Sequence, residues 1–277
     1  MSKKMLALYS LKYNPFCQEV PVSALFVSPA VEHFCWRIEN QLGEGGFALV
    51  TGAPGSGKSA ALRIMADRLG NLCDVNVGVL TRPHASVADF YRELGDLFGV
   101  TLTPSNRWWG AHALRQKWIA HIEASLYRPV LLIDEAQAMR PSALCELQLL
   151  ASAELDSRSI LTVVLAGDER LAQKLQTDER LPMASRIRCR LRCTPAEANA
   201  LKECLTHHLQ KAGNPRLIAK PVIHALCEHA AGNYRVLMNM ANDLLAAALQ
   251  READQIDEKL FFEVFDIRAT ASQSAPS

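Results

Sequence analysis

The segment Gly52-Ala-Pro-Gly-Ser-Gly57-Lys58-Ser59 decides the fold of this chain. It follows an apolar run, Gly46–Thr51, that predicts a strand, and it precedes Ser59–Leu69, whose apolar spacing predicts a helix. A glycine-rich turn in this position directs successive backbone N–H groups toward phosphates, and the helix that follows adds its positive N-terminus. The pattern G-x-x-x-x-G-K-[ST] therefore predicts a nucleoside triphosphate site.

Within this loop we expect ATP and Mg²⁺ to bind. The Lys58 ammonium reaches the β- and γ-phosphate oxygens, and the Ser59 hydroxyl ligates Mg²⁺. The predicted nucleotide-binding residues of the loop are Gly52, Ala53, Pro54, Gly55, Ser56, Gly57, Lys58, Ser59 and Ala60.

A second acidic motif follows a buried strand further along the chain. The apolar run Val130–Ile133 leads directly into Asp134 and Glu135. Asp134 is predicted to hold Mg²⁺ through water, and Glu135 to orient or deprotonate the water that attacks ATP. Two acids after a strand can also be an ordinary polar strand end, but the upstream phosphate loop favours Mg²⁺-dependent ATP hydrolysis.

Apolar strands alternate with helical patterns through the first two-thirds of the chain. Further strands are predicted at Cys73–Leu80 and Ile160–Ala166, so the fold class is α/β with a parallel sheet covered on both faces. After Pro195 every pattern is helical, which predicts a small all-helical domain. The predicted organisation is an N-terminal extension packed on the nucleotide site (residues 1–45), an ATPase core (46–194), a helical lid (195–268) and a disordered tail (269–277).

Composition limits the function classes. Hydrophobic residues make up 49% of the 277 residues and charged residues 21%, the balance of a chain that buries a core. The 30 basic and 29 acidic residues leave a net charge of +1, so any polyanion site must be local. The longest apolar runs are far shorter than the about 20 residues of a membrane helix, and the sequence has no signal-peptide pattern, so we expect a cytoplasmic protein. Its eight cysteines are expected to be reduced thiols.

Taken together, the motifs resemble those of the AAA+ ATPases. Besides Lys58-Ser59 and Asp134-Glu135, the sequence has a polar residue after the next strand, an arginine before the domain junction and a Gly-x-x-Arg in the helical region. Within that superfamily, four further segments are similar to the ExeA-like group, which also contains the transposition regulators TnsC and TniB and, more distantly, IstB. These segments are Leu11-Lys-Tyr-Asn-Pro-Phe16, Phe26–Pro29, Leu165–Gly167 and Gly232-Asn-Tyr-Arg235. The resemblance implies a P-loop AAA+ three-layer core followed by a helical lid.

The resemblance also implies residue roles. Asp168 falls at the sensor-one position, although an acid there departs from the family pattern and either contacts the nucleotide or faces a neighbouring side chain. Arg186 matches the arginine finger inserted into a neighbouring subunit, with Arg188 as the substitute, so slow hydrolysis in a homo-oligomer is expected. Arg235 matches the lid arginine that reports nucleotide state or is a surface arginine. Phe16 packs over the adenine or belongs to the core.

The segment Leu181–Cys193 carries four alternating arginines and no acid: Arg186, Arg188, Arg190 and Arg192. On a strand this spacing places all four side chains on one face. The segment is either a solvated edge strand or a contact surface for another subunit or a polyanion.

The residues that would contact DNA are expected after the second strand, where the transposition regulators track DNA phosphates. The candidates are Arg82, His84, Thr103, Ser105, Asn106 and Arg107. The alternative is a loop that caps the next helix, with Trp109 and Trp118 in the core.

The resemblance implies a bacterial, ATP-dependent regulator that assembles on duplex DNA without strong sequence preference. The assembly would be a ring or helical filament with a hexamer-like arrangement of subunits. Its partners would be a transposase or integrase and a target-selection protein. The alternatives are an ExeA-like motor for secretion or protein remodelling without DNA binding, and a nucleotide-state switch with negligible turnover.

A zinc site is not expected among the histidines and cysteines of the C-terminal region, because these residues lie inside helical patterns. They are His224, Cys227 and His229, together with Cys204, His207 and His208.

Overall fold

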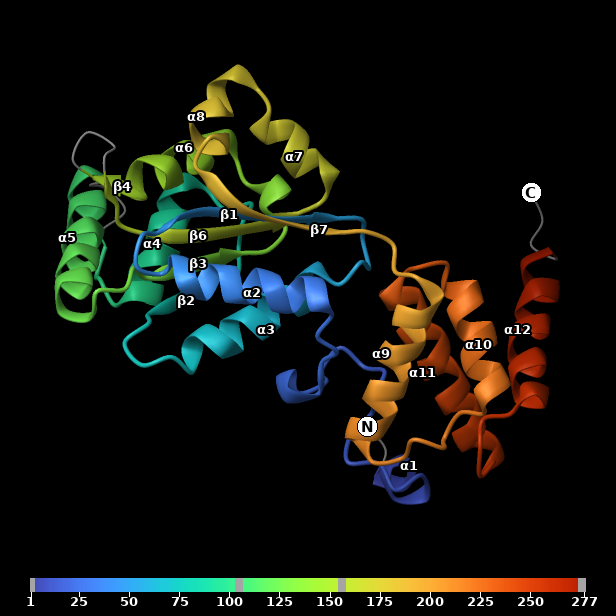
Figure 1. Ribbon diagram of the computed structural model, residues 1–277. Coiled ribbons are helices and arrows are strands. Elements are labelled where there is room, and N and C mark those ends of the chain that lie inside the picture. The colour runs from blue at the N-terminus through green and yellow to red at the C-terminus, as the bar shows by residue number, and fades with distance from the viewer. Residues whose placement is uncertain (1–2, 103–106, 154–157, 274–277) are drawn as a thin grey trace. The chain divides into compact units, whose positions relative to one another are not determined.

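Five parallel strands form the central sheet of the computed structural model (Figure 1), which describes residues 3–102, 107–153 and 158–273. The strands lie in the order β2-β3-β6-β1-β7. Their bounds are β1 Gly46–Gly52, β2 Val77–Leu80, β3 Val130–Ile133, β6 Thr162–Gly167 and β7 Ile187–Cys193. Every residue of β3 and β6 is buried, as expected for strands that are covered on both faces.

Helices cover both faces of this sheet. The crossover from β1 to β2 runs in the opposite direction to the later crossovers, so right-handed connections place its helix on the opposite face from theirs. The helices α2 (Pro29–Gln41) and α3 (Lys58–Gly70) lie on one side, and α4 (Val87–Phe98), α6 (Pro141–Leu150) and α7 (Glu169–Leu175) lie on the other (Figure 1). The remaining elements are α5 (Arg107–Ser125), which packs against α4, α8 (Leu181–Ala184), the 3₁₀ turns η2 (Ala136–Ala138) and η3 (Asp178–Arg180), and the short strands β4 (Ser152–Ala153) and β5 (Arg158–Ser159).

The structure divides the chain into two compact units. One consists of residues 27–54 and 58–193, and the other of residues 1–26, 55–57 and 194–277. The division after Cys193 separates the sheet from four helices, α9 Ala198–Ala212, α10 Lys220–Ala230, α11 Tyr234–Arg251 and α12 Glu258–Gln273. The α/β core with a helical C-terminal region is therefore confirmed.

The N-terminal 45 residues do not form one extension. Residues 1–26 contain α1 (Lys3–Leu8) and the turn η1 (Val22–Ala24), and they belong to the helical unit, whereas α2 belongs to the sheet unit. The reason is burial of apolar side chains. Met5, Tyr9, Leu11 and Phe16 lie in one hydrophobic cluster with side chains of α9, α10, α11 and α12.

Two further boundaries differ from the sequence predictions. Strand β2 begins at Val77 rather than Cys73, because Asp74 has a φ of +66°, in the left-handed region that a strand does not use. Helix α12 continues to Gln273, through the alanine-containing start of the predicted tail, while residues 274–277 lie outside the described part. All eight cysteines are free thiols, and none of the described helices is long and apolar enough to cross a membrane.

Candidate active site

Three loops leave the sheet at the same edge, and the register of strands β1, β3 and β6 is the reason. Thr51 of β1 pairs with Gly167 of β6, and Ile133 of β3 pairs with Leu165 of β6. In a parallel sheet the carboxyl ends of neighbouring strands share one edge, which is where α/β proteins bind ligands. The phosphate loop, the acidic pair after β3 and Asp168 after β6 therefore start from the same edge.

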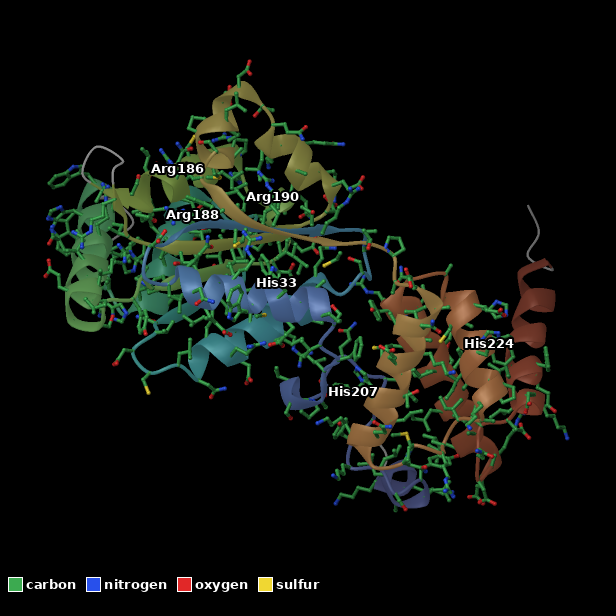
Figure 2. The ribbon with its side chains drawn as sticks, viewed as in Figure 1. His33, Arg186, Arg188, Arg190, His207 and His224 are labelled. Atoms are coloured by element: carbon green, nitrogen blue, oxygen red, sulfur yellow. The ribbon has the colours of Figure 1, made fainter. Side chains whose placement is uncertain are left out.

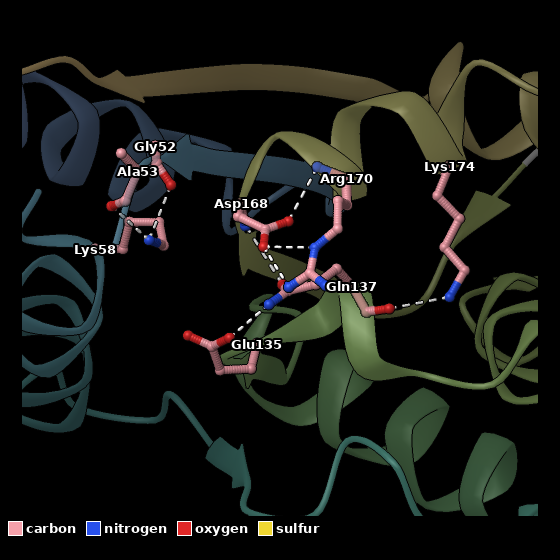
Figure 3. Close-up of polar contacts among 8 residues, drawn as sticks. All are labelled: Gly52, Ala53, Lys58, Glu135, Gln137, Asp168, Arg170 and Lys174. Atoms are coloured by element: carbon pink, nitrogen blue, oxygen red, sulfur yellow. Dashed lines mark hydrogen bonds and ion pairs between the residues drawn. The ribbon is translucent and has the colours of Figure 1, made fainter. Parts of the chain in front are cut away.

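The phosphate loop has the backbone that its sequence predicts. Gly55 and Gly57 have φ values of +82° and +97°, which L side chains rarely adopt. Lys58 is buried, and its Nζ donates hydrogen bonds to the carbonyl oxygens of Gly52 at 2.9 Å and Ala53 at 3.0 Å (Figure 3). The ammonium is thus held against the loop that would surround the phosphates.

The donor set of this loop fits a magnesium nucleotide. Ser56 Oγ is buried without a hydrogen-bond partner among the described atoms, so it is a polar atom left to be satisfied. Ser59 is exposed at the start of α3, and Asp134 is half-buried after β3. These two would hold Mg²⁺, with phosphate and water oxygens as its other ligands. Within the described ranges no group of three or more His, Cys, Asp or Glu side chains is placed to hold a metal.

Glu135 occupies a special backbone conformation after β3. Its φ is +51° and its ψ +37°, which is left-handed and costs a non-glycine residue about 1 kcal/mol or more. The Glu135 N–H donates to Asp134 Oδ1 at 2.8 Å, and the Glu135 residue itself is exposed. This turn separates the two neighbouring acids and allows them different partners.

Asp168 faces Arg170. Its Oδ1 accepts a hydrogen bond from the Arg170 N–H at 2.9 Å, and its Oδ2 accepts one from Arg170 Nε at 2.8 Å. These contacts cap the N-terminus of α7. The hydrogen bond from the Arg170 side chain is the main cause of the lowered pKa of Asp168. A sensor-one role for Asp168 stays a prediction, beside this observed role as a helix cap.

Two residues of this region were missed in the sequence. Gln137 Nε2 donates to Glu135 Oε2, and Gln137 Oε1 accepts from the Asp168 N–H at 3.3 Å (Figure 3). Arg170 is the second. The available signals were their positions, each two residues after a predicted functional acid.

Arg186 lies just before β7 and is half-buried. It borders a cavity of about 670 Å³ whose lining also includes Tyr91, Arg115 and Glu146. The cavity belongs entirely to the sheet unit. The finger role of Arg186 stays a prediction.

The other three arginines of the run lie along an edge strand. Arg188, Arg190 and Arg192 are exposed, while Cys189 and Leu191 between them are buried, so these three arginines share one face of β7. Arg186, which was predicted to share that face, lies before the strand. Figure 2 shows Arg186, Arg188 and Arg190 along this segment. Arg188 forms an ion pair with Glu44, and Arg192 lies 3.9 Å from Glu169.

Two residues of the helical unit, Arg235 and Phe16, were predicted to contact the nucleotide, and the structure shows the local surroundings of each. Arg235 is exposed in the first turn of α11, and its N–H donates to the side chain of Asn233, the helix cap, at 3.0 Å. Phe16 is 4% exposed within the helical cluster, as its predicted alternative role in the core requires. Contacts of Phe16 and Arg235 with ATP stay predictions.

The predicted DNA-contacting residues are only partly described. Arg82 and His84 are exposed between β2 and α4. Thr103, Ser105 and Asn106 lie outside the described residues, and Arg107 begins α5 with its side chain undescribed. Among the tryptophans, Trp118 is buried in the core, whereas Trp109 is 49% exposed and Trp108 76% exposed.

Residues 40–175 match the family model described as AAA domain. The chain has the P-loop AAA+ fold. It is 29% identical over 216 residues to general secretion pathway protein A of Aeromonas hydrophila, a match that covers 76% of this chain. Because the match covers only 39% of that protein, the chain spans about two-fifths of the relative's length.

Solved structures show the same fold. Cdc6p from Pyrobaculum aerophilum has a TM-score of 0.70 and 13% identity, with 95% of this chain and 74% of that chain covered. Drosophila ORC bound to DNA has a TM-score of 0.68 and 18% identity, with 99% and 70% covered. At 13% and 18% identity, these likenesses show the fold alone.

Proposed function

We propose that the chain is an ATPase that converts ATP and water to ADP and phosphate. The observation that carries this proposal is the shared sheet edge from which the phosphate loop and the Asp134-Glu135 pair extend. Lys58 would neutralise phosphate charge, while Ser59 and Asp134 would hold Mg²⁺. The bound Mg²⁺ would stabilise charge on the phosphate oxygens.

Glu135 is the proposed general base. Its carboxylate would accept a proton from the attacking water, whose oxygen bonds to the γ-phosphorus as the bond from that phosphorus to the β-phosphate oxygen breaks. We further propose that Arg186 of one subunit completes the site of its neighbour, so that turnover requires a homo-oligomer in the form of a ring or filament.

The first candidate for the process is assembly on duplex DNA. In this proposal ATP-bound subunits assemble on DNA without strong sequence preference and recruit or activate a transposase or integrase together with a target-selection protein. Support comes from the sequence resemblance to TnsC and TniB, from the fold shared with an ORC structure that contains DNA, and from exposed Arg82 and His84. Short polar and basic side chains contact backbone phosphates without reading bases.

The second candidate is a motor for secretion or protein remodelling. It is favoured by the similarity to general secretion pathway protein A, which extends over 216 residues. This candidate needs the same ATP hydrolysis but no DNA.

DNA binding separates the two candidates. We expect random-sequence duplex DNA to bind in the presence of ATP or a nonhydrolysable analogue, with affinity that falls as salt rises. Replacing Arg82 and His84 by glutamine should weaken binding and reduce the salt dependence, whereas Arg216→Gln, at an exposed position of the helical unit, should not. ATP turnover without DNA binding at low salt would exclude the first candidate and leave the second.

A further inference from the structure

Gln137 connects the ends of two neighbouring strands through its side chain. The carboxamide donates through Nε2 to Glu135, which follows β3, and accepts through Oε1 from the N–H of Asp168, which follows β6 (Figure 3). The reverse orientation of the amide would place its oxygen against a carboxylate and its NH₂ against a backbone N–H. Both contacts therefore require the same orientation.

Gly167 makes room for this bridge. A Cβ added to Gly167 would lie 2.4 Å from Gln137 Oε1 and 2.8 Å from Cδ2 of Leu171, both closer than real Cβ contacts. The φ of Gly167 is not in the left-handed region, so close approach of Gln137 and Leu171, rather than backbone conformation, accounts for a glycine here.

The backbone of Gln137 is held as well. Lys174 of α7 donates through Nζ to the carbonyl oxygens of Gln137 at 3.1 Å and Met139 at 2.6 Å. Burial lowers the pKa of Lys174, and the two carbonyl oxygens accept hydrogen bonds from two of the three N–H donors of its ammonium group. Both the main chain and the side chain of Gln137 are therefore tied to the segment that runs from Asp168 into α7.

We propose that Gln137 is a positioning residue for ATP hydrolysis, which fixes one oxygen of the Glu135 carboxylate and links that carboxylate to the N-terminus of α7. This inference rests on the proposed role of Glu135 as the base. Asp168 uses its own carboxylate on Arg170, so the carboxamide of Gln137 provides the polar side-chain bridge between the two strand ends. A carboxylate fixed at one oxygen presents the other oxygen to water in a constant direction, which is what proton abstraction requires.

The direct test replaces Gln137 by methionine, which has similar length but no hydrogen-bonding amide. We expect Gln137→Met to lower kcat for ATP hydrolysis by about 10- to 100-fold, since small misplacements of reacting groups have effects of this size. The KM for ATP should change little, because Gln137 contacts Glu135 rather than the phosphate loop. The matched control is Gln173→Met, an exposed glutamine of α7, which should retain wild-type kcat.

A double-mutant cycle separates positioning from a general structural effect. In a Glu135→Gln background, Gln137→Met should leave the residual rate unchanged, because a positioning residue acts only through the group that it positions. A further large loss in that background would overturn the proposal. Gly167→Ala provides a second perturbation should Gln137→Met fail to fold, and it should reproduce the loss of kcat by displacing the carboxamide.

The outcomes distinguish this inference from the function on which it rests. Normal turnover by Glu135→Gln would remove Glu135 from catalysis and overturn the proposed mechanism itself. An inactive Glu135→Gln combined with wild-type kcat in a folded Gln137→Met would overturn only the positioning role.

Discussion

Asp168 can act as the cap of helix α7 alone, or its carboxylate can also act on the nucleotide or the attacking water. These two roles predict different rates of ATP hydrolysis for the substitution Asp168→Asn. As the cap of α7, its carboxylate accepts from the backbone and side chain of Arg170. Loss of such a cap costs about 1 kcal/mol, within a range of roughly 0.5–2 kcal/mol. In a domain of 150–250 residues that loss lowers the unfolding midpoint by about 2–4 °C, which is the expected effect of Asp168→Ala.

Asp168→Asn should behave differently. The amide oxygen still accepts from the Arg170 N–H, so most of the cap remains. The lost ion pair contributes little because the Arg170 side chain is 75% exposed. We expect Asp168→Asn to unfold close to the wild-type temperature and to hydrolyse ATP at nearly the wild-type rate.

The pH dependence gives a second readout. Because the folded pKa of Asp168 is lowered, mainly by its hydrogen bond from Arg170, its charged form stabilises the fold above the unfolded pKa of about 3.9. This contribution is lost as pH falls through the folded pKa. The small difference in unfolding midpoint between wild type and Asp168→Asn should therefore be constant near neutral pH and shrink below about pH 4.

Thermal unfolding monitored by circular dichroism and steady-state ATP turnover are the assays, with the exposed Asp178→Asn as control. A variant Asp168→Asn that unfolds like wild type but no longer hydrolyses ATP would refute the conclusion that the Asp168 carboxylate acts only as a helix cap. The carboxylate would then act on the nucleotide or the attacking water.

Two other predictions concern the helical unit and the shared site. Burial lowers the pKa of His208, so the folded state favours the neutral imidazole. The neutral imidazole contributes fully to the free energy of unfolding above the unfolded pKa of about 6.5, and this contribution declines as pH falls below that value. His208→Gln should weaken this acid sensitivity of the unfolding midpoint and the exposed His224→Gln should not; identical pH profiles would contradict the assignment. Mixing Arg186→Ala with Lys58→Ala subunits should restore part of the ATP turnover that each lacks alone. Absence of any recovery would argue against an arginine supplied between subunits.

The sequence by itself determined the features that depend on short-range chemistry. The glycines of the phosphate loop, Lys58 and the Asp134-Glu135 pair are contiguous motifs, and the required backbone conformations follow from the residue types present. Alternation of apolar strands and helices also determined the parallel sheet, because fully apolar runs can be strands only where both faces are covered. The alternating burial of β7 followed from its period of two.

Only the tertiary structure decided which distant groups meet. The sequence shows that residue 16 is an apolar phenylalanine, but it does not show that Phe16 is buried with side chains of α9 and α10. Phe16 precedes Ala198, the first residue of α9, by 182 positions (198 − 16). The same limit applies to Gln137 and Asp168, which are 31 positions apart and become neighbours through the pairing of β3 with β6. A sequence pattern indicates which face of a helix or strand is buried. The hydrogen-bond partners of a side chain depend instead on the order and register of the strands, which all elements of the fold determine together.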